Sequence, residues 1–114
     1  MLYEDRQMFD YHGSRWKKKR KYILHLDGFK CQIDKMYGKT TDAEIVHHIY
    51  PADEYPEYAW CNWNLISVSK ANHNRLENRK TGRLTELGVR LQRATTPGID
   101  WRKNNAKRNP PTFE

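Results

Sequence analysis

The spacing of hydrophobic and polar positions changes several times along this chain, and each change predicts a new element. In "RWKKKRKYILHL", residues 15–26, apolar side chains recur among basic ones, which predicts an amphipathic helix with Ser14 as its cap and Gly28 at its end. Residues 29–33 then alternate, and "AEIVHHIY", residues 43–50, is an apolar run closed by a proline. Such short runs predict two strands, and the loop between them favours an antiparallel hairpin.

Two more helices are predicted in the second half of the chain. Ser69 is a typical N-cap, and the positions that follow it predict a helix over residues 70–80. Leucines three and four residues apart predict a last helix within residues 83–94, although Gly88 lowers the helix propensity there. The segment 51–63 has two prolines and several acids, so we expect an irregular connection whose tryptophans pack onto the core.

Length and composition fit one domain, and the predicted strands and helices make it an α+β domain. The chain has 114 residues, of which 37% are hydrophobic, enough for one small core. We expect an N-terminal extension over residues 1–14, a folded domain over 15–95 and a basic tail over 96–114. No apolar run approaches the roughly 20 residues of a membrane helix, and the N-terminal segment carries acids where a signal peptide is apolar. The sequence therefore predicts a soluble cytoplasmic protein with no membrane partner.

The charge balance favours a polyanionic partner. Lys and Arg number 21 against 14 acids, which gives a formal net charge of +7. Lysines and arginines that neutralise phosphates release counterions, so an excess of them favours binding to nucleic acid. An anionic membrane surface is a weaker candidate, because the basic segments have no long amphipathic apolar face.

Five polar residues suggest chemistry: His47, His48, Asn64, His73 and Glu77. Successive side chains of a strand point to opposite faces, so His47 and His48 cannot do the same job. His73 and Glu77 are four residues apart, so on a helix they share a face and can bind one metal ion together. A neutral imidazole is a good ligand for a divalent ion, and a second imidazole is a good general base. Strand parity alone does not decide which adjacent histidine takes which task.

The segments "VHHIYP", "NWNL" and "ANHN" occur in this order along the chain. Together they resemble the motif of the HNH endonucleases of phages and bacteria. The basic stretch "WKKKRKYILHLDGFKCQI" is similar to the helix and strand that precede the motif in that family, so the resemblance spans about residues 15–85. It implies a ββα-metal fold, in which a two-stranded antiparallel hairpin packs on a helix around one divalent ion, here with flanking N- and C-terminal helices.

The resemblance also implies a set of metal ligands. His47 and His73 would bind the ion, and Glu77 lies where some family members place a third ligand, with Asn74 as the competing neighbour. Two imidazoles, a carboxylate and phosphate oxygens suit Mn²⁺ or Mg²⁺, while Zn²⁺ or Ni²⁺ could bind more tightly and support less activity.

The implied reaction is hydrolysis of a DNA phosphodiester bond. His48 would be the general base that activates the attacking water, and Asn64 would hold the loop and the His48 ring by hydrogen bonding. The products expected in this family carry 5′-phosphate and 3′-hydroxyl ends. One active site cuts one strand per event, so a double-strand break needs a dimer or two successive nicks.

Many family members also hold a structural zinc ion with two C-x-x-C pairs. The matching positions here are Cys31 with Asp34, and Ser69 with Asn72. One thiolate cannot build the usual tetrahedral zinc site, so we expect no structural zinc and a hairpin held by packing and hydrogen bonds instead. Cys61 lies outside these positions and is expected to be a packing residue.

The expected partner is DNA, double-stranded and bound with weak sequence specificity by a monomer or weak dimer. Two rival interpretations remain: a non-catalytic nucleic-acid-binding module with the same fold, and a metal-stabilised subunit of a larger phage or restriction complex. The residues expected to contact phosphates are Arg15, Lys17, Lys18, Lys19, Arg20, Lys21, Arg75, Arg79, Lys80 and Arg83, with Arg102, Lys103, Lys107 and Arg108 of the tail as further candidates.

Overall fold

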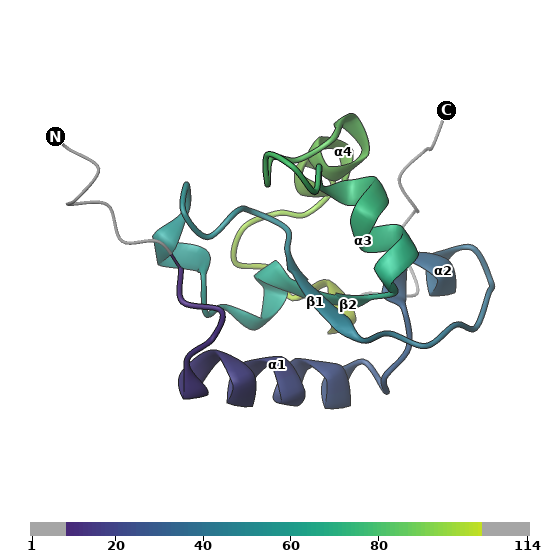
Figure 1. Ribbon diagram of the computed structural model, residues 1–114. Coiled ribbons are helices and arrows are strands. Elements are labelled where there is room, and N and C mark those ends of the chain that lie inside the picture. The colour runs from purple at the N-terminus through teal and green to yellow at the C-terminus, as the bar shows by residue number, and fades with distance from the viewer. Residues whose placement is uncertain (1–8, 104–114) are drawn as a thin grey trace, which may run out of the picture.

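The computed structural model describes residues 9–103, and these form an α+β fold around one short hairpin (Figure 1). The elements in chain order are α1 (Ser14–Leu26), α2 (Gln32–Met36), β1 (Ile45–His48), the 3₁₀ turns η2 (Pro56–Tyr58) and η3 (Asn62–Asn64), β2 (Leu65–Val68), α3 (Lys70–Leu76) and α4 (Glu86–Arg93). Within this part of the chain, no helix is both long and apolar enough to cross a bilayer.

The hairpin separates the helices into two groups. β1 and β2 are antiparallel, and His47 lies opposite Ile66 while His48 lies opposite Leu65. α1 runs along one side of the strands, and α3 and α4 lie on the other (Figure 1). Adjacent side chains of β1 therefore point toward different helices, which is the geometric basis of the site.

The core fills the space between the strands and the helices on both sides. Ile23 of α1, Leu65 and Ile66 of β2, Leu76 of α3 and Leu91 of α4 are completely buried in one cluster. Ile23 of α1 and Leu91 of α4 belong to the apolar stripes predicted from the periodicity of these two segments. Burial of this kind is the main stabilising contribution in a domain of this size.

The predicted strand over residues 29–33 is wrong. Phe29 adopts a left-handed conformation with φ of 59°, and Cys31 is already the N-cap of α2. Lys30 forms only an isolated bridge with Asp42. The true partner of β1 is β2, in which every residue is buried, so its sequence has no polar alternation by which to recognise a strand.

Two helix ends also differ from prediction. Gly13, not Ser14, is the N-cap of α1. α3 stops at Leu76, because Glu77 has an extended backbone and forms a bridge with Leu84. Ser69 does cap α3 as predicted, since its Oγ accepts a hydrogen bond from the Asn72 amide at 3.2 Å.

Gly88 has a packing reason within α4. A Cβ atom built at this position would lie 2.2 Å from the carbonyl oxygen of Leu76. Only glycine lets α4 approach the end of α3 this closely. The residue that weakens the helix in the sequence is therefore the one that permits the contact between the two helices.

The four positions that match the zinc ligands of relatives lie together between α2 and α3. Asn72 Nδ2 donates to Asp34 Oδ1 at 3.0 Å and to Ser69 Oγ at 3.2 Å, and lies 3.5 Å from Cys31 Sγ. Thr41 Oγ1 donates to the second oxygen of Asp34 at 2.7 Å. A hydrogen-bonded cluster thus joins the two helices at these positions.

The segment after α4 returns to the core. Trp101 is buried and its Nε1 donates to the carbonyl oxygen of Trp63 at 2.9 Å. The guanidinium of Arg102 bonds both carboxylate oxygens of Asp27, at 2.7 and 3.0 Å. Arg102, one of the tail residues expected to contact DNA, is therefore committed to an internal ion pair, because Asp27 is buried under the hairpin. Lys107 and Arg108 lie outside the described residues.

Candidate functional site

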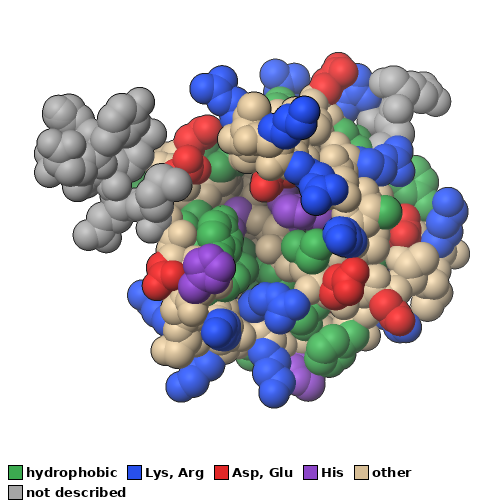
Figure 2. Space-filling view, viewed as in Figure 1, with side chains coloured by type: hydrophobic (Ala, Val, Ile, Leu, Met, Phe, Trp, Pro, Cys, Tyr) green, Lys and Arg blue, Asp and Glu red, His purple; other side chains and the backbone are tan. Residues whose placement is uncertain are grey.

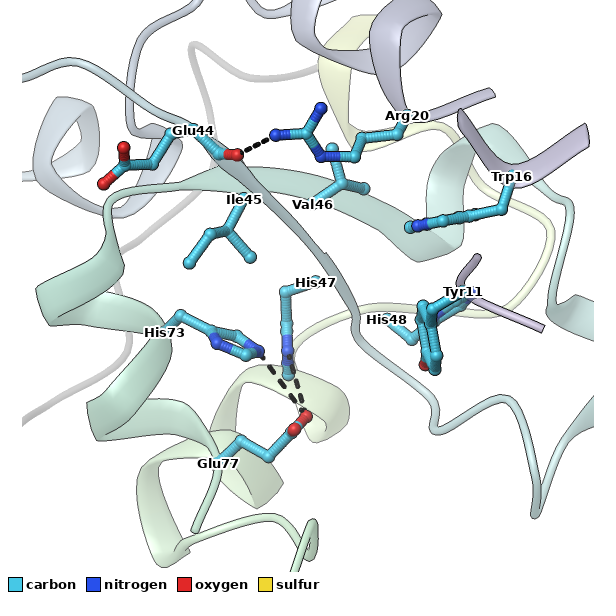
Figure 3. A pocket seen from close by; sticks show the side chains of 10 residues that line it. All are labelled: Tyr11, Trp16, Arg20, Glu44, Ile45, Val46, His47, His48, His73 and Glu77. Carbon is cyan, nitrogen blue, oxygen red and sulfur yellow. Dashed lines mark hydrogen bonds and ion pairs between the residues drawn. The ribbon is translucent and has the colours of Figure 1, made fainter. Parts of the chain in front are cut away.

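Three potential metal ligands meet on the α3 side of β1. His47 comes from β1, His73 from α3, and Glu77 from the residue that follows α3. The two imidazole rings are 5.4 Å apart, and Glu77 Oε1 lies 3.7 Å from His47 Nδ1 and 3.7 Å from His73 Nε2 (Figure 3). One ligand atom from each residue can be chosen so that all lie within 4.8 Å of one another.

Local structure explains why these three side chains converge. β2 passes through the cap Ser69 directly into α3, so the helix folds back over β1 and carries His73 to His47. The prediction placed Glu77 on the helix, but the residue lies just beyond the end of α3. Its extended backbone and its bridge to Leu84 direct the carboxylate back to the two rings. His73 and Glu77 are therefore close together as expected, although not through helical spacing.

His47 is fully buried and neutral. Burial, together with the neighbouring His73 and His48, lowers the pKa of His47 to about 3. Its 3.7 Å contact with Glu77 is therefore not an ion pair near neutral pH. Neither ring nitrogen of His47 finds a hydrogen-bond partner within residues 9–103. A buried polar group without a partner costs about 1–3 kcal/mol, so this ring fits the role of a ligand to a bound cation.

His48 points to the opposite side of β1, toward α1. Its Nε2 lies 3.0 Å from the carbonyl oxygen of Ala59, which can only accept, so Nε2 carries the ring proton. Its Nδ1 lies 3.2 Å from the hydroxyl of Tyr11, and its ring stacks on Trp16 at 5.1 Å. Burial lowers the pKa of His48, against raising contributions from the Ala59 hydrogen bond and from acidic neighbours. The neutral ring thus presents a lone pair at Nδ1.

Asn64 immediately precedes β2 and is not one of the residues that line the pocket. Its side-chain oxygen accepts from the Tyr50 amide at 2.7 Å, and its Nδ2 donates to the carbonyls of Tyr50 at 3.0 Å and of Tyr58 at 3.2 Å. Its own carbonyl accepts from the amide of Ile49 at 2.9 Å. Asn64 therefore fixes the chain immediately after His48 through the backbone and has no hydrogen bond to the ring itself among the described contacts.

The three candidate ligands and His48 line a pocket of about 350 Å³ (Figure 3). The residues that line it are Tyr11, Trp16, Arg20, Glu44, Ile45, Val46, His47, His48, His73 and Glu77. The lining combines the three converging ligands, the ring of His48 and one cation. Five lining residues are not among the site residues predicted from the sequence: Tyr11, Trp16, Glu44, Ile45 and Val46. Tyr11 lies in a segment without periodicity, and the pattern of α1 predicts only a packing role for Trp16.

The basic residues of α1 divide into two kinds. Lys17, Lys18 and Lys21 are exposed to solvent. The other three have partners within the molecule. Arg15 lies over the ring of Trp60 at 3.8 Å, Lys19 bonds Asn62, and Arg20 bonds the carbonyl of Glu44 at the edge of the pocket.

A second basic group follows α3. Arg75, Arg79, Lys80 and Arg83 are exposed and lie on the segment that carries Glu77 and the loop after it. Figure 2 shows Lys and Arg side chains on both sides of the histidines at the centre of this face. The pocket therefore lies between two basic surfaces, one on α1 and one around the end of α3.

Comparison with known proteins agrees with this geometry. No protein-family model matches the chain, and no curated protein matches it significantly. A solved structure does match: the HNH endonuclease of the deep-sea thermophilic bacteriophage GVE2, crystallised with a manganese ion. The identity is 35%, the match covers 57% of this chain and 71% of that one, and the TM-score is 0.55. The chain belongs to the HNH endonuclease family.

Membership of the HNH family identifies which of the observed elements form its characteristic unit. β1, β2 and α3 form the ββα unit of the HNH fold, and His47, His73 and Glu77 lie where its strand and helix meet. The predicted hairpin and helix are therefore confirmed as a fold class, although the sequence assigned one of the two strands incorrectly.

Proposed function

We propose that this HNH protein is a metal-dependent endonuclease that hydrolyses phosphodiester bonds of DNA. The observation that carries the proposal is the separation of two histidine environments across β1. His47 joins His73 and Glu77 on one side, and His48 presents a lone pair on the other. A hydrolase that uses one ion and one general base needs such a division, because a single imidazole cannot be both ligand and base.

His47, His73 and Glu77 would hold the ion. Two neutral nitrogens and one carboxylate leave room for phosphate oxygens and water, which suits Mn²⁺ first, Mg²⁺ next, and Zn²⁺ or Ni²⁺ as further candidates. When bound, a divalent ion supplies charge neutralisation at the scissile phosphate and at the leaving oxygen. The manganese ion in the crystal of the GVE2 endonuclease supports Mn²⁺ as a candidate.

His48 is the proposed general base. The Ala59 carbonyl holds the ring as the Nε2–H tautomer, so the basic nitrogen is Nδ1. Burial keeps the imidazole neutral and therefore able to accept a proton. General base catalysis of this kind contributes roughly two to four orders of magnitude to a rate.

Asn64 is the proposed positioning residue. It holds both the amide and the carbonyl of Tyr50, which follows His48 by two residues. Because a base must be held within a fraction of an ångström of its target, rigid support of this backbone maintains the reactive geometry.

Double-stranded DNA would lie across the face that holds the pocket. The exposed lysines of α1 and the basic group after α3 flank the pocket and would contact phosphates on either side. Phosphate contacts position a duplex without reading its sequence, so specificity would be weak and affinity would fall steeply with salt. We propose a monomer or weak dimer as the active form.

Supercoiled plasmid tests the proposal. The protein is incubated with plasmid in EDTA, Mg²⁺, Mn²⁺, Zn²⁺ or Ni²⁺, and nicked and linear products are measured. We expect nicked circles with Mn²⁺ or Mg²⁺ and none with EDTA. Binding of plasmid without cutting in any metal would instead support the non-catalytic nucleic-acid-binding module.

A further inference from the structure

Tyr11 lines the pocket with a polar group to which the mechanism proposed above gives no role. Tyr11 belongs to the segment before α1, and its hydroxyl makes the hydrogen bond to Nδ1 of His48 at 3.2 Å. Because Nε2 carries the ring proton, Nδ1 must accept, and the tyrosine hydroxyl must be the donor. The only lone pair of the proposed base is thus already engaged by Tyr11.

His48 has little other access to the pocket. The whole residue is only 5% exposed. Trp16 stacks on it, and Phe9 contacts it edge-on at 4.8 Å. One ring nitrogen faces the carbonyl oxygen of Ala59 and the other faces the hydroxyl of Tyr11, so both nitrogens of the imidazole are already engaged.

The tyrosine itself is held in place. Phe9, two residues earlier, packs against Tyr11, Trp16 and Trp60 at centroid distances of 4.7, 5.2 and 5.1 Å. Trp16 also contacts the Tyr11 ring edge-on at 5.5 Å. On the other side of Tyr11, Gly13 is the N-cap of α1. The backbone is therefore anchored before and after Tyr11. This anchoring disfavours movement of the Tyr11 hydroxyl away from His48.

We propose that Tyr11 relays the proton from the attacking water to His48, an inference that rests on the nuclease function proposed above. The water donates one hydrogen to Tyr11 Oη while Tyr11 transfers its own hydroxyl hydrogen to Nδ1 of His48. The water oxygen, left with one hydrogen, forms the new bond to phosphorus as the bond to the leaving oxygen breaks. Tyr11 ends as a neutral phenol and His48 as imidazolium, so no proton or charge is lost.

The environment of Tyr11 keeps its hydroxyl protonated before the reaction begins. Tyr11 lines the pocket and its hydrogen bond to His48 is partly buried, while the residue as a whole is 49% exposed. Burial, together with the carboxylates of Glu77 and Asp53, raises the pKa of Tyr11 to about 12. The hydroxyl is therefore a constant donor to His48 and can accept a hydrogen bond from water through its free lone pair.

Tyr11→Phe is the decisive variant, because it removes the hydroxyl and keeps the ring in its aromatic contacts. Single-turnover nicking of supercoiled plasmid is measured at saturating Mn²⁺ and protein. We expect a rate at least about tenfold lower than wild type, with unchanged DNA and Mn²⁺ affinity. Tyr37→Phe is the matched control, since Tyr37 closes α2 and is not part of the pocket, and it should cut at the wild-type rate.

A second measurement separates relay from mere support of the His48 ring. The wild-type single-turnover rate is followed in mixtures of H₂O and D₂O, where transfer of two protons gives a curved dependence on the deuterium fraction and transfer of one gives a line. A curved dependence together with a slow Tyr11→Phe variant supports the relay. The relay is overturned if Tyr11→Phe cuts as fast as wild type or faster, or if the dependence is linear. Absence of metal-dependent nicking by the wild type would instead remove the proposed function itself.

Discussion

The carboxylate of Glu77 lies 3.7 Å from Nδ1 of His47, yet the two side chains do not form an ion pair, because burial keeps the imidazole neutral. The same carboxylate oxygen lies 3.7 Å from Nε2 of His73. A carboxylate between two imidazoles, one of them without a hydrogen-bond partner in the described chain, is an arrangement that a cation would complete.

Removal of Glu77 should therefore weaken metal binding. Glu77→Ala is expected to lower the Mn²⁺ affinity by about tenfold or more, which corresponds to about 1.4 kcal/mol, as measured by calorimetric titration. Glu86→Ala is the matched control, because Glu86 lies on α4 with its side chain 82% exposed and pairs with Arg90. An affinity of Glu77→Ala equal to that of the control would show that Glu77 is not a ligand.

Asn64 should matter for stability as well as for cutting. Asn64→Ala leaves the partly buried amide and carbonyl of Tyr50 without these partners, so the free energy of unfolding should fall by about 2 kcal/mol in urea titrations. Nicking should fall with it, because the chain after His48 loses its support. Asn74→Ala on the exposed side of α3 should leave the free energy of unfolding unchanged. A fully stable Asn64→Ala protein would contradict the assigned role.

The hydrogen-bonded cluster between α2 and α3 should make a pH-dependent contribution to the stability of the fold. The hydrogen bond from Thr41, and a further one from Asn72, lower the pKa of Asp34. A lowered folded-state pKa stabilises the protein above the unfolded value, which is about 3.9, and this stabilisation is lost as the pH falls through the folded value. Thr41→Val should therefore cost about 1 kcal/mol at pH 7.

The difference between Thr41→Val and wild type should shrink as the pH falls below about 4 and through the lowered folded-state pKa of Asp34, because the carboxyl group then becomes protonated in both proteins. Melting temperatures across this range measure it. Thr40→Val, at the exposed neighbouring position, serves as control and should follow wild type at every pH. A constant difference across the range would mean that the bond to the Asp34 carboxylate is not its source.

The ion pair between Asp27 and Arg102 should be required for the fold. The Asp27 side chain is 1% exposed, so Arg102→Ala leaves a buried carboxylate without its counter-charge. The expected cost is about 3 kcal/mol in the free energy of unfolding. Lys103→Ala, at the exposed next position, should be neutral. Equal stability of the two variants would show that Asp27 finds another partner.

The resemblance to the HNH motif grouped His47, His73 and Glu77 from the sequence, and the structure brings these three side chains together. Their role as metal ligands stays a prediction. β2 was missed as a strand because both of its faces are buried, which leaves a short apolar run without alternation. The alternation in residues 29–33 predicts a strand that the structure does not contain, because Phe29 takes a left-handed conformation and the chain turns into α2.

Tyr11 shows the limit of sequence reasoning for the site. Its contact with His48 joins a segment without periodicity to a strand far along the chain, and only the packing of Phe9, Trp16 and Trp60 brings them together. Arg102 is the opposite case. It was grouped with the DNA contacts by its charge, whereas the three-dimensional position of Asp27 makes it an internal partner.

The central claim is that His47 and His48 have separate tasks, and one comparison tests it most directly. Mn²⁺ affinity and the single-turnover nicking rate are measured for wild type, His47→Ala and His48→Ala on the same plasmid. We expect His48→Ala to bind Mn²⁺ as wild type does and to cut at least about a hundredfold more slowly, and His47→Ala to lose metal affinity. Cutting by His48→Ala at the wild-type rate, or unchanged Mn²⁺ affinity of His47→Ala, would contradict the account.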